Sequence, residues 1–306
     1  MISLNNFITE SIIINERNMV TFDNNVLYPN NGWAVIMLGG SGSGKGWFKN
    51  NKLPIDGKLI DVDDLKDKFS EMGLDKEILN GETYDPKNIK HVSAIHKAVH
   101  DKQWKDKILR NFFKTNILNG RLDNIIFDIT GQSPENSVTN KIITLTYLLG
   151  YKVCCIWVIA KREEAMIRNI QRSRSVSDDT LHTIHASLAK NLPDFLQKNN
   201  TGKYINDLWL YFSNPLDIKR PYNSKEEDRK ALIKVNKVVD ANGSRFVFND
   251  DIKTRLDKYL TTDTASSFIS SEELKEKYGV VVWDEQSNKE IVKINRNNLT
   301  YNAFRK

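Results

Sequence analysis

Short apolar runs alternate with longer amphipathic stretches along most of this chain. The run WAVIML, residues 33–38, is continuous and ends in glycines, as a strand buried on both faces does. Five further runs predict strands: GKLIDVDD from residue 57, NIIFDIT from 124, YKVCCIWVIA from 151, DLWLYFS from 207 and KVNKVVD from 234.

Helical periodicity fills the segments between these runs. A long polar region from Lys66 to Gly120 contains two amphipathic segments, and a helix over residues 135–149 ends at Gly150, which suits a helix C-cap. Strands that alternate with helices in this way predict an α/β fold, in which a parallel sheet is flanked by crossover helices.

Composition shifts divide the chain into three expected parts. Residues 1–31 form an N-terminal extension, residues 32–262 the α/β domain, and residues 263–306 a small C-terminal appendage with one helix and a hairpin. The segment from about residue 173 to residue 229 is polar and rich in turn formers, and this pattern predicts a mostly helical lid inserted in the α/β domain.

The net charge of +6 favours an anionic partner, such as a nucleotide, a nucleic acid or a phosphorylated metabolite. No apolar run is long enough to cross a bilayer, so we expect no membrane partner. The only cysteines, Cys154 and Cys155, are adjacent in an apolar strand, and we expect them to be reduced core residues. These features predict a cytoplasmic protein.

The stretch GGSGSGKG fits the phosphate-binding pattern G-x-x-x-x-G-K, and it lies where that loop must lie, after an apolar strand and before a helix. Its backbone N–H groups can turn toward the phosphates of ATP or GTP, and the lysine can reach the β- and γ-phosphates. The expected phosphate-binding residues are Gly39, Gly40, Ser41, Gly42, Ser43, Gly44, Lys45 and Gly46.

Gly46 stands at the position where a Ser or Thr hydroxyl usually ligates Mg²⁺. Magnesium keeps several waters and often takes one or two protein ligands beside the phosphates, so Ser43, Asp61 or Asp128 could hold it. The missing hydroxyl also fits a second hypothesis, a nucleotide-binding protein without turnover.

Two acidic residues, Asp61 and Asp63, lie at the carboxyl end of the second predicted strand. That end of an open parallel sheet faces the active-site crevice, and a carboxylate there can accept the proton of an attacking hydroxyl. In an extended stretch the two share a face, whereas Asp64 points away. The alternative is that Asp63 or Asp64 caps the following helix.

Further polar residues follow the next two strands. Asp128 ends the third strand and could hold magnesium-bound water or the acceptor, and Thr130 and Gln132 could hydrogen-bond the substrate. After the fourth strand come Arg168, Arg172 and Arg174 on a predicted helix, where they could neutralise transition-state charge. An ordinary helix ion pair of Arg168 with Glu164 is the alternative.

Four histidines form two helical pairs without a recognisable metal-binding pattern. We expect all four on solvated helix faces rather than around a metal; they are His96 with His100, and His182 with His185.

The order and spacing of these motifs over about residues 32–180 resemble the zeta-toxin-like P-loop kinases. The resemblance implies transfer of the γ-phosphoryl group of ATP or GTP to a hydroxyl, with Mg²⁺. It places Asp63 on the catalytic base and Lys66 on the basic residue of the same motif. Asp128 and Thr130 fall on a segment that binds an acceptor sugar.

The same resemblance places Arg168, with Arg172 or Arg174, on phosphate-clamping arginines. The chain departs from the family pattern at Gly46 and at Asp64, which replaces a Ser or Thr. Ile129 replaces the glycine of the third motif, and Gln132 stands near a family arginine. The acceptor therefore stays open among a nucleotide sugar, a nucleotide and a nucleic acid.

The Asn-, Lys- and Ile-rich composition and the aromatic residue after GSGKG also resemble kinases of large tailed bacteriophages, which include polynucleotide and modified-base DNA kinases. Leu4, Phe7 and Glu10 resemble capsid-targeting leaders of phage internal proteins, but the favoured explanation of residues 4–12 is an amphipathic helix that packs on the core. Two other hypotheses are a packaged, non-catalytic virion protein and a nucleic-acid-binding module.

Overall fold

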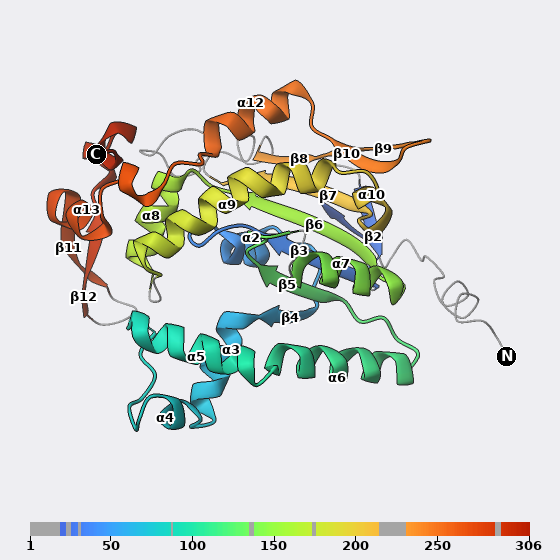
Figure 1. The fold of residues 1–306 in the computed structure, drawn as a ribbon, viewed down its shortest axis with the longest axis horizontal. Helices are drawn as coiled ribbons and strands as arrows, with labels where there is room; N and C mark the ends of the chain where they lie inside the picture. The colour runs from blue at the N-terminus through green and yellow to red at the C-terminus, as the bar shows by residue number, and fades with distance from the viewer. Residues whose placement is uncertain are drawn as a thin grey trace.

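A six-stranded sheet forms the centre of the computed structural model, which describes residues 19–22, 26–29, 32–86, 88–134, 138–172, 176–213, 231–284 and 289–306 (Figure 1). The strand order is β4-β5-β3-β6-β7-β8. These strands are β4 (Lys58–Asp61), β5 (Ile125–Ile129), β3 (Trp33–Leu38), β6 (Lys152–Ile159), β7 (Asp207–Phe212) and β8 (Leu232–Lys234).

The first five strands in that order are mutually parallel, which confirms the predicted α/β sheet, whereas β8 runs antiparallel to β7. The stretch KVNKVVD does not extend this sheet as a single strand. Most of it forms β9 (Asn236–Asp240), which pairs with β10 (Gly243–Val247) in a separate antiparallel hairpin. A tight turn between β9 and β10 makes this local pairing possible, whereas a parallel strand needs a long crossover.

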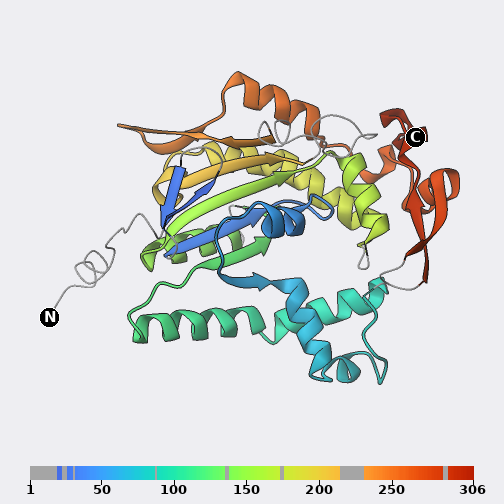
Figure 2. The same cartoon turned by 180° about the vertical axis from the view of Figure 1, so that it is seen from behind.

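Helices cover both faces of the sheet. The described α-helices are α2 (Lys45–Asn51), α3 (Val62–Glu71), α4 (Asp75–Ile78), α5 (Ile89–Asp101), α6 (Trp104–Leu118), α7 (Val138–Leu148), α8 (Arg162–Gln171), α9 (Asp178–Gln197), α10 (Thr201–Tyr204), α12 (Asp250–Tyr259) and α13 (Ser271–Tyr278). Figure 2 shows α2 on the face of the sheet opposite to α7 and α9. None of the helices in these described ranges has the length and apolar run needed to cross a membrane.

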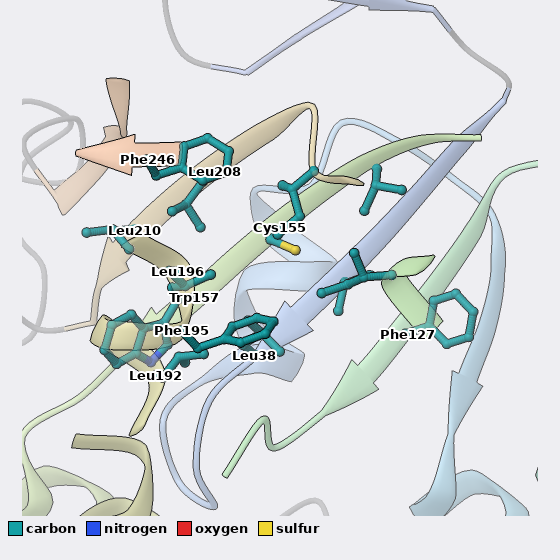
Figure 3. Packing of buried hydrophobic residues seen from close by; sticks show 14 of the residues in the cluster. Leu38, Phe127, Cys155, Trp157, Leu192, Phe195, Leu196, Leu208, Leu210 and Phe246 are labelled. Atoms are coloured by element: carbon teal, nitrogen blue, oxygen red, sulfur yellow. The ribbon is translucent and has the colours of Figure 1, made fainter. Parts of the chain in front are cut away.

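Alternate residues of each central strand enter two different cores, because successive side chains of a strand point to opposite faces. Leu38, Cys155 and Trp157 pack with α9 residues such as Leu192 on one face (Figure 3). On the other face Met37 and Phe48, from β3 and α2, share a second core. This packing fixes the end of β3 and the start of α2, and therefore both ends of the loop between them.

The helices α3 to α6 lie beside β4, at the edge of the sheet (Figures 1 and 2). Leu65 and Phe69 of α3 pack on Ile95 and Val99 of α5 in a core of their own. Both cysteines are buried free thiols, as predicted, and burial raises the pKa of each.

The ends of the chain carry small appended elements. The hairpin of β1 (Met19–Phe22) and β2 (Val26–Pro29) precedes the sheet, and the helix expected over residues 4–12 lies outside the described residues. At the other end, α13 precedes the hairpin of β11 (Gly279–Asp284) and β12 (Lys289–Ile294). The range expected for a lid includes α9 and also β7, which belongs to the central sheet.

Candidate nucleotide-binding site

The glycine-rich loop, residues 39–44, joins β3 to α2 at the carboxyl edge of the sheet. Gly42 and Gly44 have φ angles of +74° and +100°, which side-chain-bearing residues rarely adopt. A Cβ on Gly42 would also lie 2.4 Å from the Ala165 carbonyl oxygen of α8. Glycine at residue 42 therefore allows both the turn and the close approach of α8.

Lys45 begins α2 and folds its side chain back into the loop. Its Nζ donates to the carbonyl oxygens of Gly39, at 2.6 Å, and Gly40, at 3.4 Å. The same Nζ lies 3.5 Å from Asp128 Oδ1, and both side chains are largely buried. The structure thus brings together two of the predicted site residues, which are 83 positions apart in the sequence.

Two carboxylates are neighbours at this edge of the sheet. Asp61 ends β4 and pairs in register with Asp128 of β5, so their backbones lie about 5 Å apart. Residues paired in this way share a face, and Met37, which pairs with Asp128 from β3, lies in the core on the α2 side. Asp61, Asp128 and Lys45 therefore converge on one face of the carboxyl edge.

Asp63 is not part of an extended stretch with Asp61, so the shared face predicted for the two residues is wrong. The strand ends at Asp61, and α3 begins at Val62. Asp63 and Asp64 therefore fall in the first turn of α3, where acidic residues are favourable beside the positive end of the helix. Lys66, one turn further along α3, is buried, with 6 % of its surface exposed.

The segment after β5 touches the loop through its backbone. The Gly39 N–H donates to the Thr130 carbonyl oxygen at 3.1 Å, and Asn191 of α9 donates to the Gln132 carbonyl oxygen at 3.1 Å. The Thr130 side chain is half-buried and that of Gln132 is exposed.

Arg168 of α8 binds backbone carbonyl oxygens of the loop. Its Nη1 donates to the carbonyl oxygens of Gly42, at 3.2 Å, and Ser43, at 3.0 Å, and to Ser213 Oγ at 2.8 Å. Its Nε donates to Glu164 Oε1 at 2.8 Å, so the alternative of a helix ion pair also holds.

Arg172, at the end of α8, donates from Nη1 to Ser41 Oγ at 3.1 Å. Of the three arginines predicted for the site, Arg168 and Arg172 therefore contact the loop, and Arg174 lies outside the described residues.

His185 of α9 supports the loop from a third side. Its Nε2 lies 2.8 Å from the Ser41 carbonyl oxygen and, because that oxygen can only accept, the ring N–H donates. Burial lowers the pKa of His185 to about 4, so the ring is neutral at pH 7.

The predicted solvated faces are wrong for both histidines of α9, because His182 and His185 are buried, whereas His96 is exposed as predicted. The signal for His185 was its place four residues after Leu181 and three before Leu188, on the apolar stripe of the helix.

Sequence reasoning also missed Ser213 and Asn191, which lie too far from the loop in sequence for a local pattern to connect them with it.

Part of the donor set that Mg²⁺ prefers is present at the loop. Asp61 and Asp128 supply carboxylates, and Ser43 Oγ is buried and without a hydrogen-bond partner, beside Gly39. Across the described residues, no three His, Cys, Asp or Glu side chains cluster as a complete metal site would require. Magnesium that keeps its waters and binds phosphate oxygens fits this partial set.

The buried strand, the glycine loop with its lysine and the acidic neighbouring strands define an α/β P-loop fold. Among solved structures, the chain is similar to the AvrRxo1-ORF1:AvrRxo1-ORF2 complex solved with ATP, with a TM-score of 0.52 and 14 % identity over 81 % of this chain and 70 % of that one. The same complex with sulphate ions gives 0.50 and 13 %, over 78 % of this chain and 68 % of that one.

The chain spans 65 % of the matched protein in the native form of that complex. A structure of the PezAT chromosomal toxin-antitoxin system of Streptococcus pneumoniae gives a TM-score of 0.40 and 15 % identity, over 74 % of this chain and 83 % of that one. No protein-family model and no curated protein sequence matches the chain. At these identities the likeness concerns the fold.

Proposed function

We propose that this protein is a P-loop kinase that transfers the γ-phosphoryl group of ATP or GTP to a hydroxyl group of a small-molecule or nucleotide-type acceptor. One observation carries the proposal: Lys45 Nζ lies inside the glycine loop and 3.5 Å from Asp128, whose strand neighbour is Asp61. A cation and two carboxylates at the mouth of a phosphate-binding loop are the groups that phosphoryl transfer uses.

In the proposed reaction the loop amides hold the β- and γ-phosphates. Lys45 leaves the Gly39 carbonyl for a phosphate oxygen and neutralises charge that moves during transfer. Asp63, at the start of α3, accepts the proton of the acceptor hydroxyl. The hydroxyl oxygen bonds to the γ-phosphorus while the bond between the γ-phosphorus and the bridging β-phosphate oxygen breaks.

Asp61 and Asp128 are the proposed ligands or water-mediated ligands of Mg²⁺, together with Ser43 if its hydroxyl turns toward the phosphates. The metal would supply charge neutralisation on the phosphate oxygens. Gly46 has no side chain to contribute, so the carboxylates carry more of the binding than in a loop with Ser or Thr at this position.

The acceptor lies, in this proposal, between α3 and the end of β5, within reach of Lys66, Thr130 and Gln132. The net charge of +6 favours an anionic acceptor such as a nucleotide or a nucleotide sugar. A nucleic-acid hydroxyl, as in a polynucleotide or modified-base DNA kinase, is the finer alternative.

Arg168, Arg172 and Arg174 are the proposed phosphate-neutralising arginines. Of the two that the structure describes, Arg172 is the better candidate, because it is exposed and contacts Ser41 Oγ, whereas Arg168 is held by Glu164 and by loop carbonyl oxygens. The fold similarity to a protein solved with ATP and the resemblance to zeta-toxin-like kinases support ATP as the donor.

A second candidate function is nucleotide binding without turnover. Gly46 favours it, because the residue removes the usual hydroxyl ligand of Mg²⁺. The two candidates share the phosphate loop and differ in the fate of the γ-phosphate.

The deciding experiment is incubation with γ-labelled ATP and separate pools of nucleotide sugars, nucleotides and nucleic acids, followed by separation of labelled products. The proposal expects label on one pool with the native protein and none with Lys45→Ala. The Lys49→Ala variant, one turn further along α2, is the matched control and keeps activity.

Asp63→Asn tests the proposed base. It should bind ATP with native affinity and lose transfer, whereas Asp64→Asn should keep both. Transfer at the native rate by Asp63→Asn refutes the assignment of Asp63 as the base. If the native protein binds ATP but neither labels any pool nor releases labelled phosphate, the non-catalytic candidate is supported.

A further inference from the structure

The C-terminal appendage, residues 263–306, packs directly on the helix that carries the loop-binding arginine. Met166 and Ile167 of α8 share a core with Phe268, Leu274 and Ile294 of the appendage. In both views of the fold, α13 and the β11–β12 hairpin lie beside α8 (Figures 1 and 2). The appendage and the phosphate loop are therefore held by the same helix.

One buried carboxylate connects the appendage to the loop. Glu164 has a side chain that is only 5 % exposed, and Arg296, just after β12, binds it with both arms of its guanidinium. Arg296 Nη1 donates to Oε2 at 2.7 Å, and Nη2 donates to Oε1 at 2.9 Å. Arg168 Nε donates to the same Oε1 at 2.8 Å, and its Nη1 reaches the loop.

The two arginines divide the hydrogen-bonding capacity of this carboxylate. Burial alone would raise the pKa of Glu164, but the guanidinium groups of Arg296 and Arg168 outweigh it and lower the pKa below its ordinary value. Arg296 occupies Oε2 and one position on Oε1, which leaves Arg168 a single bond through Nε. The Nη1 of Arg168 is then available to Gly42, Ser43 and Ser213.

Without Arg296, Oε2 of a buried carboxylate would lose its charged donor. A carboxylate and a guanidinium pair best through two parallel hydrogen bonds. Arg168 would therefore rotate so that its Nε and Nη2, the side-on edge of the guanidinium, bind both oxygens of Glu164, and this rotation displaces Nη1 from its position on the loop carbonyls. The glycine loop would then lose the hydrogen bonds that hold the carbonyl oxygens of Gly42 and Ser43.

We propose that Arg296 is a positioning residue for the phosphate loop: by saturating Glu164 it keeps the guanidinium of Arg168 directed at the carbonyl oxygens of Gly42 and Ser43. The predicted effect of Arg296 on nucleotide binding rests on the proposed function, whereas its predicted effect on the orientation of the Arg168 side chain does not. It gives the appendage a role in the site although the appendage contributes no residue to the loop itself.

The test compares three variants of the full chain. Arg296→Ala removes the fork, and Arg296→Lys keeps the charge but offers only one ammonium to the two oxygens. Arg305→Ala is the matched control, because Arg305 ties the same appendage to the same helix through Glu163, at 3.2 Å, and to Asp263, at 2.6 Å. Steady-state kinetics with ATP and urea unfolding are measured for each.

A loosened loop must be ordered again when the nucleotide binds, so the loss falls on nucleotide binding more than on the chemical step. We expect Arg296→Ala to raise KM for ATP about 10- to 100-fold, with a smaller change in kcat, and Arg296→Lys to recover part of the loss. Arg305→Ala should lower stability and leave KM unchanged. Equal KM changes in Arg296→Ala and Arg305→Ala, or none in either, would overturn the proposal.

A second readout separates this inference from the proposed function. In isotope-labelled protein the Nε–Hε signal of Arg168, assigned by its loss in Arg168→Lys, reports on the bond to Glu164. It should shift in Arg296→Ala and stay in place in Arg305→Ala. If the native protein neither binds nor turns over ATP, the proposed function fails, and this signal still decides the role of Arg296: an unshifted signal overturns it.

Discussion

Gly40 is a loop position where an added methyl group would clash with a buried side chain although its backbone φ lies outside the left-handed region. A Cβ at Gly40 would lie 2.4 Å from Nε2, 2.7 Å from Cδ2 and 2.8 Å from Cε1 of His185, whereas ordinary contacts begin near 3.4 Å. The ring is buried and cannot retreat into solvent. In Gly40→Ala, therefore, the loop or α9 must move by up to about 1 Å to restore an ordinary contact.

Overpacking of this kind costs about 1–3 kcal/mol, and loss of the His185–Ser41 hydrogen bond adds about 1 kcal/mol. If displacement of the loop carries the whole cost, ATP affinity falls about 30- to 700-fold, at about 1.4 kcal/mol per tenfold. Isothermal titration with ATP and Mg²⁺ measures the binding, and urea unfolding measures any part of the cost that falls on stability.

Gly46→Ala is the matched control within the same loop. A Cβ there meets no atom within 4 Å, and residue 46 lies in α2, so the variant should bind ATP normally and be slightly stabilised by helix propensity. Removal of the ring in Gly40→Ala/His185→Ala should restore part of the lost affinity. Native ATP affinity and native stability in Gly40→Ala would refute the reasoning.

Three further outcomes follow from the described contacts. Gly46→Ser should lower the Mg²⁺ concentration needed for half-maximal ATP binding relative to Gly46→Ala, because the open space accepts a hydroxyl; equal magnesium dependence would contradict a metal beside the loop. Burial lowers the pKa of His185 to about 4. The free energy of unfolding should therefore be highest above about pH 6.5 and fall by on the order of 3 kcal/mol as the pH decreases toward 4, because the ring takes up a proton more readily in the unfolded chain. The same pH slope in the native protein and in His185→Gln would argue against this. Asn124→Ala should lower the free energy of unfolding by about 1–3 kcal/mol, because Asn124 Oδ1 accepts from the Trp33 N–H at 2.9 Å and Nδ2 donates to the Asp56 carbonyl at 3.0 Å; a urea midpoint equal to that of the native protein would exclude this role.

The sequence predicts the parts of this site that depend on local pattern. The apolar run before Gly39 and the glycines themselves specify a buried strand that ends in a tight turn, so local pattern is enough to predict the loop and Lys45. The acids at the ends of β4 and β5 were found for the same reason, since parallel strands that end together bring Asp61 and Asp128 side by side.

The residues that hold the loop in place depend on contacts between distant segments. Glu164 and Arg296 are 132 residues apart, and no periodicity relates them. His185 stood on an apolar stripe, but its polarity favoured solvent, and only the close approach of α9 to Gly40 buries it. The direction of β8 was equally hidden, because a strand of three residues carries no sign of parallel or antiparallel pairing.

The most direct test of the central claim is a crystal structure with a non-hydrolysable ATP analogue and Mg²⁺. The account predicts β- and γ-phosphates within hydrogen-bonding distance of the backbone N–H groups of residues 40–45, with Lys45 Nζ moved from the Gly39 carbonyl to a phosphate oxygen. An analogue bound elsewhere on the protein, with Lys45 still on the Gly39 carbonyl, would contradict it.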